Sequence, residues 1–132
     1  MAQTVHLWLT ANGTKIDGDS SIASLEREDT IECLQFRDSV RTAREAANGM
    51  ATGMRSYEPI WLVKRIDKSS PLLAKALSQN EVIEGEFRFY RPDLGSGATE
   101  HFFTIQISEG RIASIRRRSP DASDPANTAD PP

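Results

Sequence analysis

The chain of 132 residues has few of the side chains that most enzymes and metal sites use. It contains one cysteine, Cys33, and two histidines, His6 and His101. A single cysteine excludes an intrachain disulfide and any CxxC pair. No HExxH, phosphate-binding glycine loop or nucleophile motif is present. We therefore expect no catalytic residue, no metal site, no cofactor and no enzymatic activity.

These three residues have structural interpretations. Cys33 lies in an apolar-rich stretch, which favours a small buried core residue over a reactive thiol. His6 and His101 lie on different predicted strands beside apolar residues, where histidine is more often hydrogen-bonded or solvated than a ligand. A catalytic role requires a histidine next to a carboxylate in a cleft.

Long hydrophobic runs and a strong net charge are also missing. The net charge is −3, so nucleic acid and anionic membranes are not expected partners. The one dense basic run, Arg116 to Arg118, is interpreted as a solvated strand end, with a phosphate or RNA contact as the alternative. The first residues lack the pattern of a secretory signal, and no stretch is long and apolar enough to span a membrane. We expect a protein that folds in the cytoplasm without membrane insertion.

Short β-type segments are frequent. Val5, Leu7 and Leu9 alternate with polar or amphipathic residues, a period of two that predicts a half-buried strand, and an Asn-Gly turn follows. Residues 30–40 predict a second strand, in which a slip of phase near Gln35 and Phe36 indicates a β-bulge. Further strands are predicted at residues 60–66, 82–90, 100–108 and 111–117.

One short helix is predicted between two of these strands. Ser70 is a good N-cap, and Pro71 fits the first helical position. Leu72, Leu73, Ala76 and Leu77 then form a narrow apolar stripe, which predicts a helix over about residues 71–78. So short a helix is stable only when it packs on a sheet.

Two segments lack periodicity. Residues 41–56 predict a long extended loop, and loops of this length are usually functional or disordered. Its methionines, Met50 and Met54, are adaptable apolar side chains that suit contact with a protein surface, with plain disorder as the alternative. Residues 119–132 are rich in Pro, Asp and Ala, and predict a disordered tail after a single domain of residues 1–118. The fold class is mainly β, an antiparallel barrel or sandwich with one short helix.

The run Ile66-Asp67-Lys68-Ser69-Ser70-Pro71, followed by Leu72 and Leu73, resembles a motif of the haemolysin-coregulated protein (Hcp) family. These are tube-forming proteins of the type VI secretion system. The resemblance covers about Val5 to Pro120 and includes the segment Glu100-His101-Phe102-Phe103-Thr104-Ile105, which is similar to a second family pattern.

The resemblance implies a subunit that forms homohexameric rings, which stack into a tube, carry effector proteins and meet sheath and spike components. It also implies export through the type VI apparatus without a signal peptide. The residues that it places at the contacts between subunits or rings are Arg44, Glu45, Met50, Met54 and Arg55. Relatives continue with further C-terminal strands, so a free sheet edge is expected at the 111–117 strand or its partner.

A different function remains open. A monomeric β-barrel could bind a peptide or small ligand in an apolar pocket built around Tyr57 and Trp61. Core packing of both aromatic side chains is the simpler interpretation.

Overall fold

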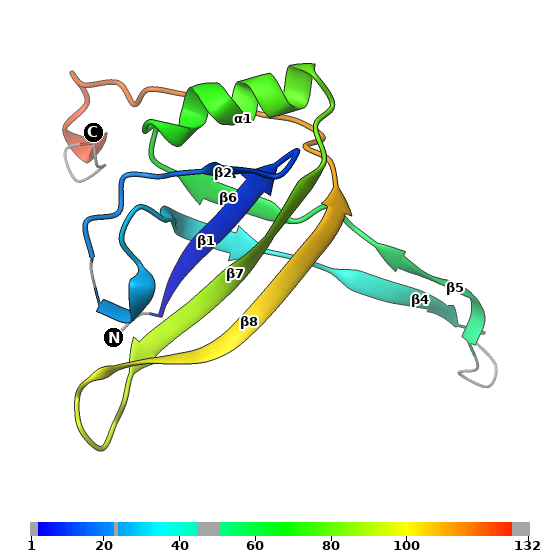
Figure 1. Ribbon diagram of the computed structural model, residues 1–132, viewed down its shortest axis with the longest axis horizontal. Helices are drawn as coiled ribbons and strands as arrows, with labels where there is room; N and C mark the ends of the chain where they lie inside the picture. The colour runs from blue at the N-terminus through cyan, green and yellow to red at the C-terminus, as the bar shows by residue number, and fades with distance from the viewer. Residues whose placement is uncertain (1–2, 23, 45–50, 128–132) are drawn as a thin grey trace.

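Antiparallel strands dominate the protein, as a computed structural model that describes residues 3–22, 24–44 and 51–127 shows (Figure 1). One sheet has the order β6-β3-β1-β7-β8, with β2 paired to β1, and β4 and β5 form a separate two-stranded sheet. The mainly antiparallel β fold with a single α-helix is as predicted. The strands are β1 Thr4–Ala11, β2 Thr14–Ile16, β3 Ile31–Arg37, β4 Val40–Arg44, β5 Ala51–Tyr57, β6 Trp61–Lys64, β7 Ile83–Pro92 and β8 Thr99–Gly110; the helices are α1 Ser69–Ser78 and the short 3₁₀ turns η1 Ser24–Glu26 and η2 Pro125–Asn127.

The core lies on one face of β1 and β7, the central strands. Val5, Leu7 and Leu9 are all buried, as the predicted alternation along β1 requires. His6 on the other face is also buried, so β1 is not half-exposed at this point. Val5 pairs with Phe89 and Leu7 with Phe87 on β7, so that apolar side chains line the same face of both strands. The Asn-Gly turn after β1 joins it to β2, as expected.

The predicted bulge is also present. The register between β3 and β6 shifts between Cys33 and Gln35. Beyond the bulge, the ring of Phe36 lies 4.8 Å from that of Phe87 and 5.1 Å from that of Phe89, both edge to face. The extra residue therefore turns Phe36 into the core, where aromatic pairs of this geometry are favourable.

Helix α1 ends at Ser78 as expected, but it begins at Ser69, and Ser70 is not its N-cap. Asp67 has the capping role, because the Ser69 N–H donates to its Oδ1 at 2.9 Å. In return, the Asp67 N–H donates to Ser70 Oγ at 3.1 Å. This is the reciprocal pattern of a capping box, and Pro71 still lies in the first turn, where no N–H is needed.

The described parts of residues 41–56 are extended as expected, but they form a β-hairpin rather than a loop. β4 pairs with β5 from Val40 opposite Tyr57 to Arg44 opposite Ala51. At its base the side chains of Val40 and Tyr57 are exposed. A hairpin whose described base has no buried face needs no alternation of apolar and polar residues there, which is why the sequence pattern missed it.

The prediction of a strand at residues 111–117 is wrong, because the chain leaves the sheet after Gly110 and has no regular structure over these residues. Glu109 adopts a left-handed conformation (φ 54°) at the register shift near the end of β8, and Gly110, the last residue of the strand, still pairs with Ile83. Ile112 still packs against the core. The division into a domain of residues 1–118 and a disordered tail of residues 119–132 stays a prediction.

Cys33 is buried as predicted, and burial raises the pKa of its thiol to about 12. A thiol of ordinary pKa would carry roughly a thousandfold more thiolate near pH 8. We therefore expect alkylation of native Cys33 by iodoacetamide to be about a thousandfold slower than in denaturant. Mass spectrometry of timed aliquots measures both rates. Equal rates in the two conditions would contradict the burial of this side chain.

Candidate subunit interface

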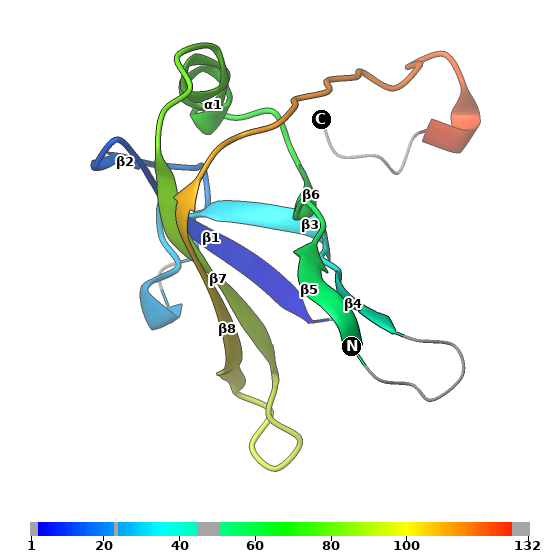
Figure 2. The ribbon, with the colours of Figure 1, turned by 90° about the vertical axis from the view of Figure 1, so that its right-hand side faces the viewer.

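Four strands form one long ribbon that bends in the middle. Along the chain, β3 is followed by β4, and β5 is followed by β6. The pair β4–β5 therefore continues the pair β3–β6. At the bend, the Glu58 N–H donates to the Ser39 carbonyl at 3.0 Å. Pro59 follows and has no N–H for the ladder. The inner half of the ribbon belongs to the main sheet, and the outer half, β4 with β5, projects away from it (Figure 2).

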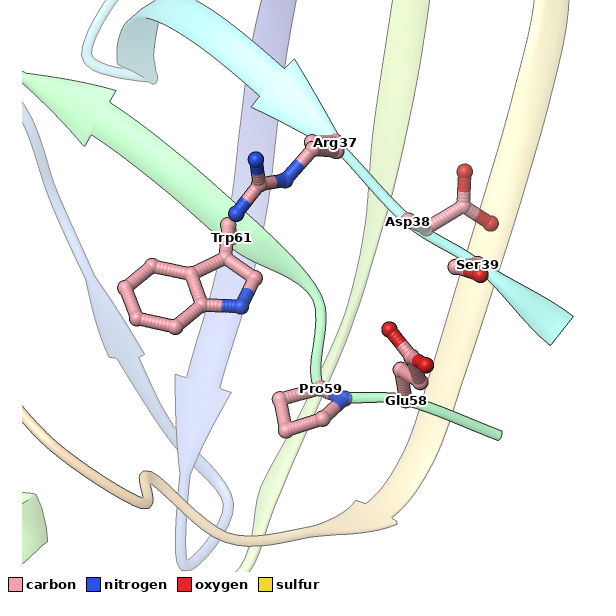
Figure 3. Close-up of a pocket in the computed structure, with 6 residues that line it drawn as sticks. All are labelled: Arg37, Asp38, Ser39, Glu58, Pro59 and Trp61. Atoms are coloured by element: carbon pink, nitrogen blue, oxygen red, sulfur yellow. The ribbon is translucent and has the colours of Figure 1, made fainter. Parts of the chain in front are cut away.

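A cleft of about 390 Å³ lies at this bend (Figure 3). The Arg37 guanidinium stacks over the Trp61 ring, 5.6 Å from its centre. Three charged side chains line the cleft, so it is not the apolar pocket of the binding-module hypothesis, and Tyr57 does not line it. The lining residues are Arg37, Asp38, Ser39, Glu58, Pro59 and Trp61.

Large apolar side chains are exposed along the same ribbon. Trp61 and Val63 are 50% and 48% exposed, and they share one face of β6 because side chains alternate along a strand. Core packing of Trp61 and Tyr57 is therefore wrong. Grouped exposed apolar residues mark interaction surfaces. We call this group the ribbon strip; its members are Val40, Tyr57, Ile60, Trp61 and Val63.

In the described part of the chain, the strand path of the main sheet ends in two free edges, because β6 pairs only with β3 and β8 pairs only with β7. The short strand β2 lies off this path and pairs only with β1. The predicted free edge is thus β8, which is twelve residues long and carries the half-exposed Phe103. Edge strands present unpaired N–H and C=O groups to which another chain can add. The edge strands β6 and β8 differ in length and composition, so a contact between them joins unlike surfaces.

The five predicted contact residues lie in or beside the projecting hairpin. Arg44 is opposite Ala51 in its register, and Arg55 is opposite Thr42. Met54 is on β5. Glu45 and Met50 lie outside the described residues. Their roles as contacts stay predictions. The exposed Trp61 and Val63 were missed, although their alternation with Leu62 and Lys64 was a usable signal.

The motif that carries the family resemblance builds a polar network at the start of α1. Lys64 Nζ donates to Asp67 Oδ1 at 2.8 Å, to the Arg65 carbonyl at 2.7 Å and to Ser70 Oγ at 3.2 Å. Burial alone would raise the pKa of Asp67, but hydrogen bonds from Lys64 and Ser69 and the Lys64 charge hold it below the usual value. The side chains of Lys64 and Asp67 are only 12% and 11% exposed. The motif therefore acts in folding, where it fixes α1 to the end of β6.

The histidines occupy different environments. His6 is fully buried and its Nδ1 lies 2.8 Å from Thr30 Oγ1. His101 is exposed, with its Nε2 2.6 Å from Thr104 Oγ1. Among the described residues, no three potential ligands gather into a metal site, and no helix there could span a membrane.

Comparisons with known proteins agree with this architecture. The sequence profile of the family described as "Type VI secretion system effector, Hcp" matches residues 8–129. The Major exported protein of Pseudomonas aeruginosa is 29% identical over 120 residues, which cover 90% of this chain and 69% of that protein.

Solved structures show the same fold. A mutated form of Hcp1 from the E. coli EAEC 042 pathovar is 28% identical, with a TM-score of 0.70 over 82% of this chain and 72% of that one. A further Hcp crystal structure is 25% identical, with a TM-score of 0.83 over 98% of this chain and 82% of that one. With its antiparallel sheet, its capped helix and a profile match along most of its length, the chain belongs to the Hcp family of type VI secretion system proteins.

Proposed function

We propose that this protein is a structural tube subunit, which assembles into rings of about six copies that stack into the tube of a type VI secretion system. The observation that carries the proposal is the pair of unlike free edges, β6 and β8, at opposite ends of the main sheet. A closed ring needs a heterologous interface, in which one surface of each copy meets a different surface of the next. Two unlike edges supply such a pair.

The ribbon strip supports the same assignment. Trp61 and Val63 lie on the edge strand β6, so a copy that adds to this edge would also cover their exposed side chains. Removing apolar surface from water contributes roughly 25 cal/mol per Å². The side chain of Phe103 on β8 offers a second apolar surface at the opposite edge.

The projecting hairpin is proposed as the contact to a neighbouring copy or to the next ring. A two-stranded hairpin is at best marginally stable alone in water. β4 and β5 pair with no other strand of the described chain, so a neighbour would stabilise them. The contact residues on or next to this hairpin would be Arg44, Glu45, Met50, Met54 and Arg55.

Effector proteins, the sheath and the spike are the further proposed partners, with no nucleic acid among them. The protein would fold in the bacterial cytoplasm and leave through the secretion apparatus. The name of its Pseudomonas aeruginosa relative, Major exported protein, supports export. We propose no enzymatic activity.

The test is the solution mass, measured by light scattering on a size-exclusion column over a wide concentration range. We expect a discrete ring mass of about six subunits for the natural chain. Val63→Asp places a charge on the β6 edge and should shift the protein to monomer, because the contact would then bury an unpaired carboxylate. The melting curve of the variant should remain near that of the natural chain, since Val63 is half exposed.

Leu72→Asp is the matched control. It makes the same kind of change on an exposed apolar side chain, but on helix α1 and on neither edge strand. This variant should assemble like the natural chain. A natural chain that stays monomeric at every concentration would overturn the tube assignment and favour a monomeric binding module. Assembly of Val63→Asp to the same ring would remove β6 from the interface.

A further inference from the structure

Residues 24–30 cover a cluster of buried polar side chains on the face of the sheet opposite the core. We call this segment the flap. It places the side chains of Arg27 and Thr30 over His6 of β1 and Tyr90 of β7, and all four residues are buried. The Arg27 guanidinium lies 4.9 Å from the centre of the Tyr90 ring. The His6 and Tyr90 rings meet edge to face at 5.7 Å.

A chain of hydrogen bonds identifies which nitrogen of His6 carries the proton. The Thr30 hydroxyl donates to the Arg27 carbonyl at 2.6 Å, so its hydrogen is already used. Thr30 Oγ1 must then accept from His6 Nδ1, 2.8 Å away, and Nδ1 is the protonated nitrogen of the neutral ring. His6 Nε2 therefore carries a lone pair. It is buried and has no hydrogen-bond partner.

Burial, rather than the charges around His6, opposes a second proton. Glu32 of β3, which lies opposite His6 in the register, favours that proton, and Arg27 of the flap opposes it to a smaller extent. Tyr90 of β7 and, beyond it, His101 of β8 face the same space, with their rings 5.1 Å apart. The carboxylates of the flap, Glu26, Glu28 and Asp29, are exposed. Glu26 lies 3.9 Å from Arg88 of β7, the residue opposite His6 in the register, and Asp29 lies 3.6 Å from Lys68. A proton on Nε2 would thus create a buried cationic N–H beside a guanidinium without an acceptor.

The flap itself is held in an unfavourable backbone conformation. Leu25, Glu26 and Asp29 have φ values of 57°, 61° and 60°, a region that residues with side chains rarely adopt. Its hydrogen bonds to the preceding segment include Asp29 N–H to the Ser20 carbonyl at 2.9 Å. A segment under such strain opens readily once the interactions beneath it are lost.

We propose that residues 24–30 form an acid-sensitive flap, which a proton on His6 Nε2 opens to expose the His6–Tyr90 face of β1 and β7. This device is independent of the tube assignment. Opening relieves two costs together: the buried cation gains water, and the left-handed residues relax.

The direction of the effect follows from the same burial. Desolvation lowers the pKa of His6 in the closed state, with Arg27 adding to the effect and Glu32 opposing it. The open state, in which the ring is solvated, binds the proton more tightly. Acid therefore favours opening, and the closed state is fully restored above the usual pKa of histidine.

Amide hydrogen exchange of the full chain tests this, at about pH 7.5 and about pH 5 with labelling times scaled for intrinsic rates. We expect protection of the peptide that covers residues 24–30 to fall at least about tenfold at the lower pH, while β1 and β7 stay protected. Proton NMR follows the ring signals, which His101→Gln assigns because the chain has two histidines. Flap opening and His6 protonation should share one midpoint.

Two variants complete the test. His6→Gln cannot titrate and should lose the pH dependence, whereas His101→Gln changes an exposed histidine and should retain it. The proposal is overturned if the flap keeps its protection while His6 titrates, if His6→Gln retains the pH dependence, or if protection falls across the whole sheet together. If His6→Gln does not fold, the natural chain still gives the test. A midpoint pH of flap opening that differs from the midpoint pH of His6 protonation would also overturn the proposal.

Discussion

Replacing Asp67 with alanine is expected to lower the free energy of unfolding by about 3 kcal/mol, as is typical when one member of a buried ion pair is removed. The substitution leaves the ammonium of Lys64 nearly buried and without its counter-ion. It also removes the acceptor of the Ser69 N–H at the start of α1, and a lost cap alone costs about 1 kcal/mol. Urea unfolding followed by circular dichroism at about pH 7 measures the change.

The effect should fade in acid. Because the folded state holds the pKa of Asp67 below its usual value, the carboxylate stabilises the fold above that usual value, and the contribution is lost as pH falls through the lowered pKa. The difference in unfolding free energy between the natural chain and the variant should therefore shrink between about pH 5 and about pH 2.

Asp93→Ala is the control. Asp93 makes a similar contact, with Gly95 N–H donating to its Oδ1 at 3.1 Å, but on an exposed hairpin tip, so little change is expected. An equal loss of unfolding free energy in Asp67→Ala and Asp93→Ala would contradict a stabilising buried ion pair between Lys64 and Asp67.

The elements that the sequence predicted well are those with one buried face. Val5, Leu7 and Leu9 alternate because β1 packs one face on the core, and the phase slip at Gln35 marks a real bulge. The helix was found because its apolar stripe and Pro71 are local signals. Its cap was misplaced because a serine and an aspartate both suit that role, and only the fold decides which side chain reaches the free N–H.

What depends on distant partners could not be predicted in the same way. The strands β4 and β5 are held together by the hydrogen bonds between them. The described base of this hairpin has no buried face, so its sequence shows no alternation of apolar and polar residues. The strand expected at residues 111–117 has β-type residues, but β propensity produces a strand only where a neighbour is available.

The candidate interface shows the same division. The family resemblance placed contact residues on the hairpin around Arg44 and Arg55. That β6 and β8 are sheet edges could not be predicted in this way, because the strand order depends on pairing between distant segments of the chain. Trp61 reads as a core residue from its apolar neighbours Ile60 and Leu62. Its alternation with Leu62 on β6 indicates two different faces, but only the strand order shows that the face of Trp61 is the exposed one.

Gly85→Ala is expected to destabilise the protein by about 3 kcal/mol or more, or to prevent folding, because it overpacks the centre of the sheet. Gly85 lies opposite Leu9 where β7 crosses β1. A Cβ atom at this position would lie 2.0 Å from the Trp8 carbonyl oxygen and 3.0 Å from the Leu9 Cα. Both are backbone atoms of a paired strand, so no rotation of a side chain can relieve the clash.

Gly95→Ala supplies the comparison, since its Cβ would come no closer than 3.7 Å to another atom, the Asp93 Oδ1. Its stability should stay within about 0.5 kcal/mol of the natural chain. Thermal and urea unfolding of both variants decide the point, because the change from Gly to Ala lowers the entropy of the unfolded chain by the same amount in the two. A Gly85→Ala protein as stable as Gly95→Ala would contradict the close approach of β1 to β7. It would also contradict the strand order that leaves β6 and β8 at the two edges, on which the proposed ring contact depends.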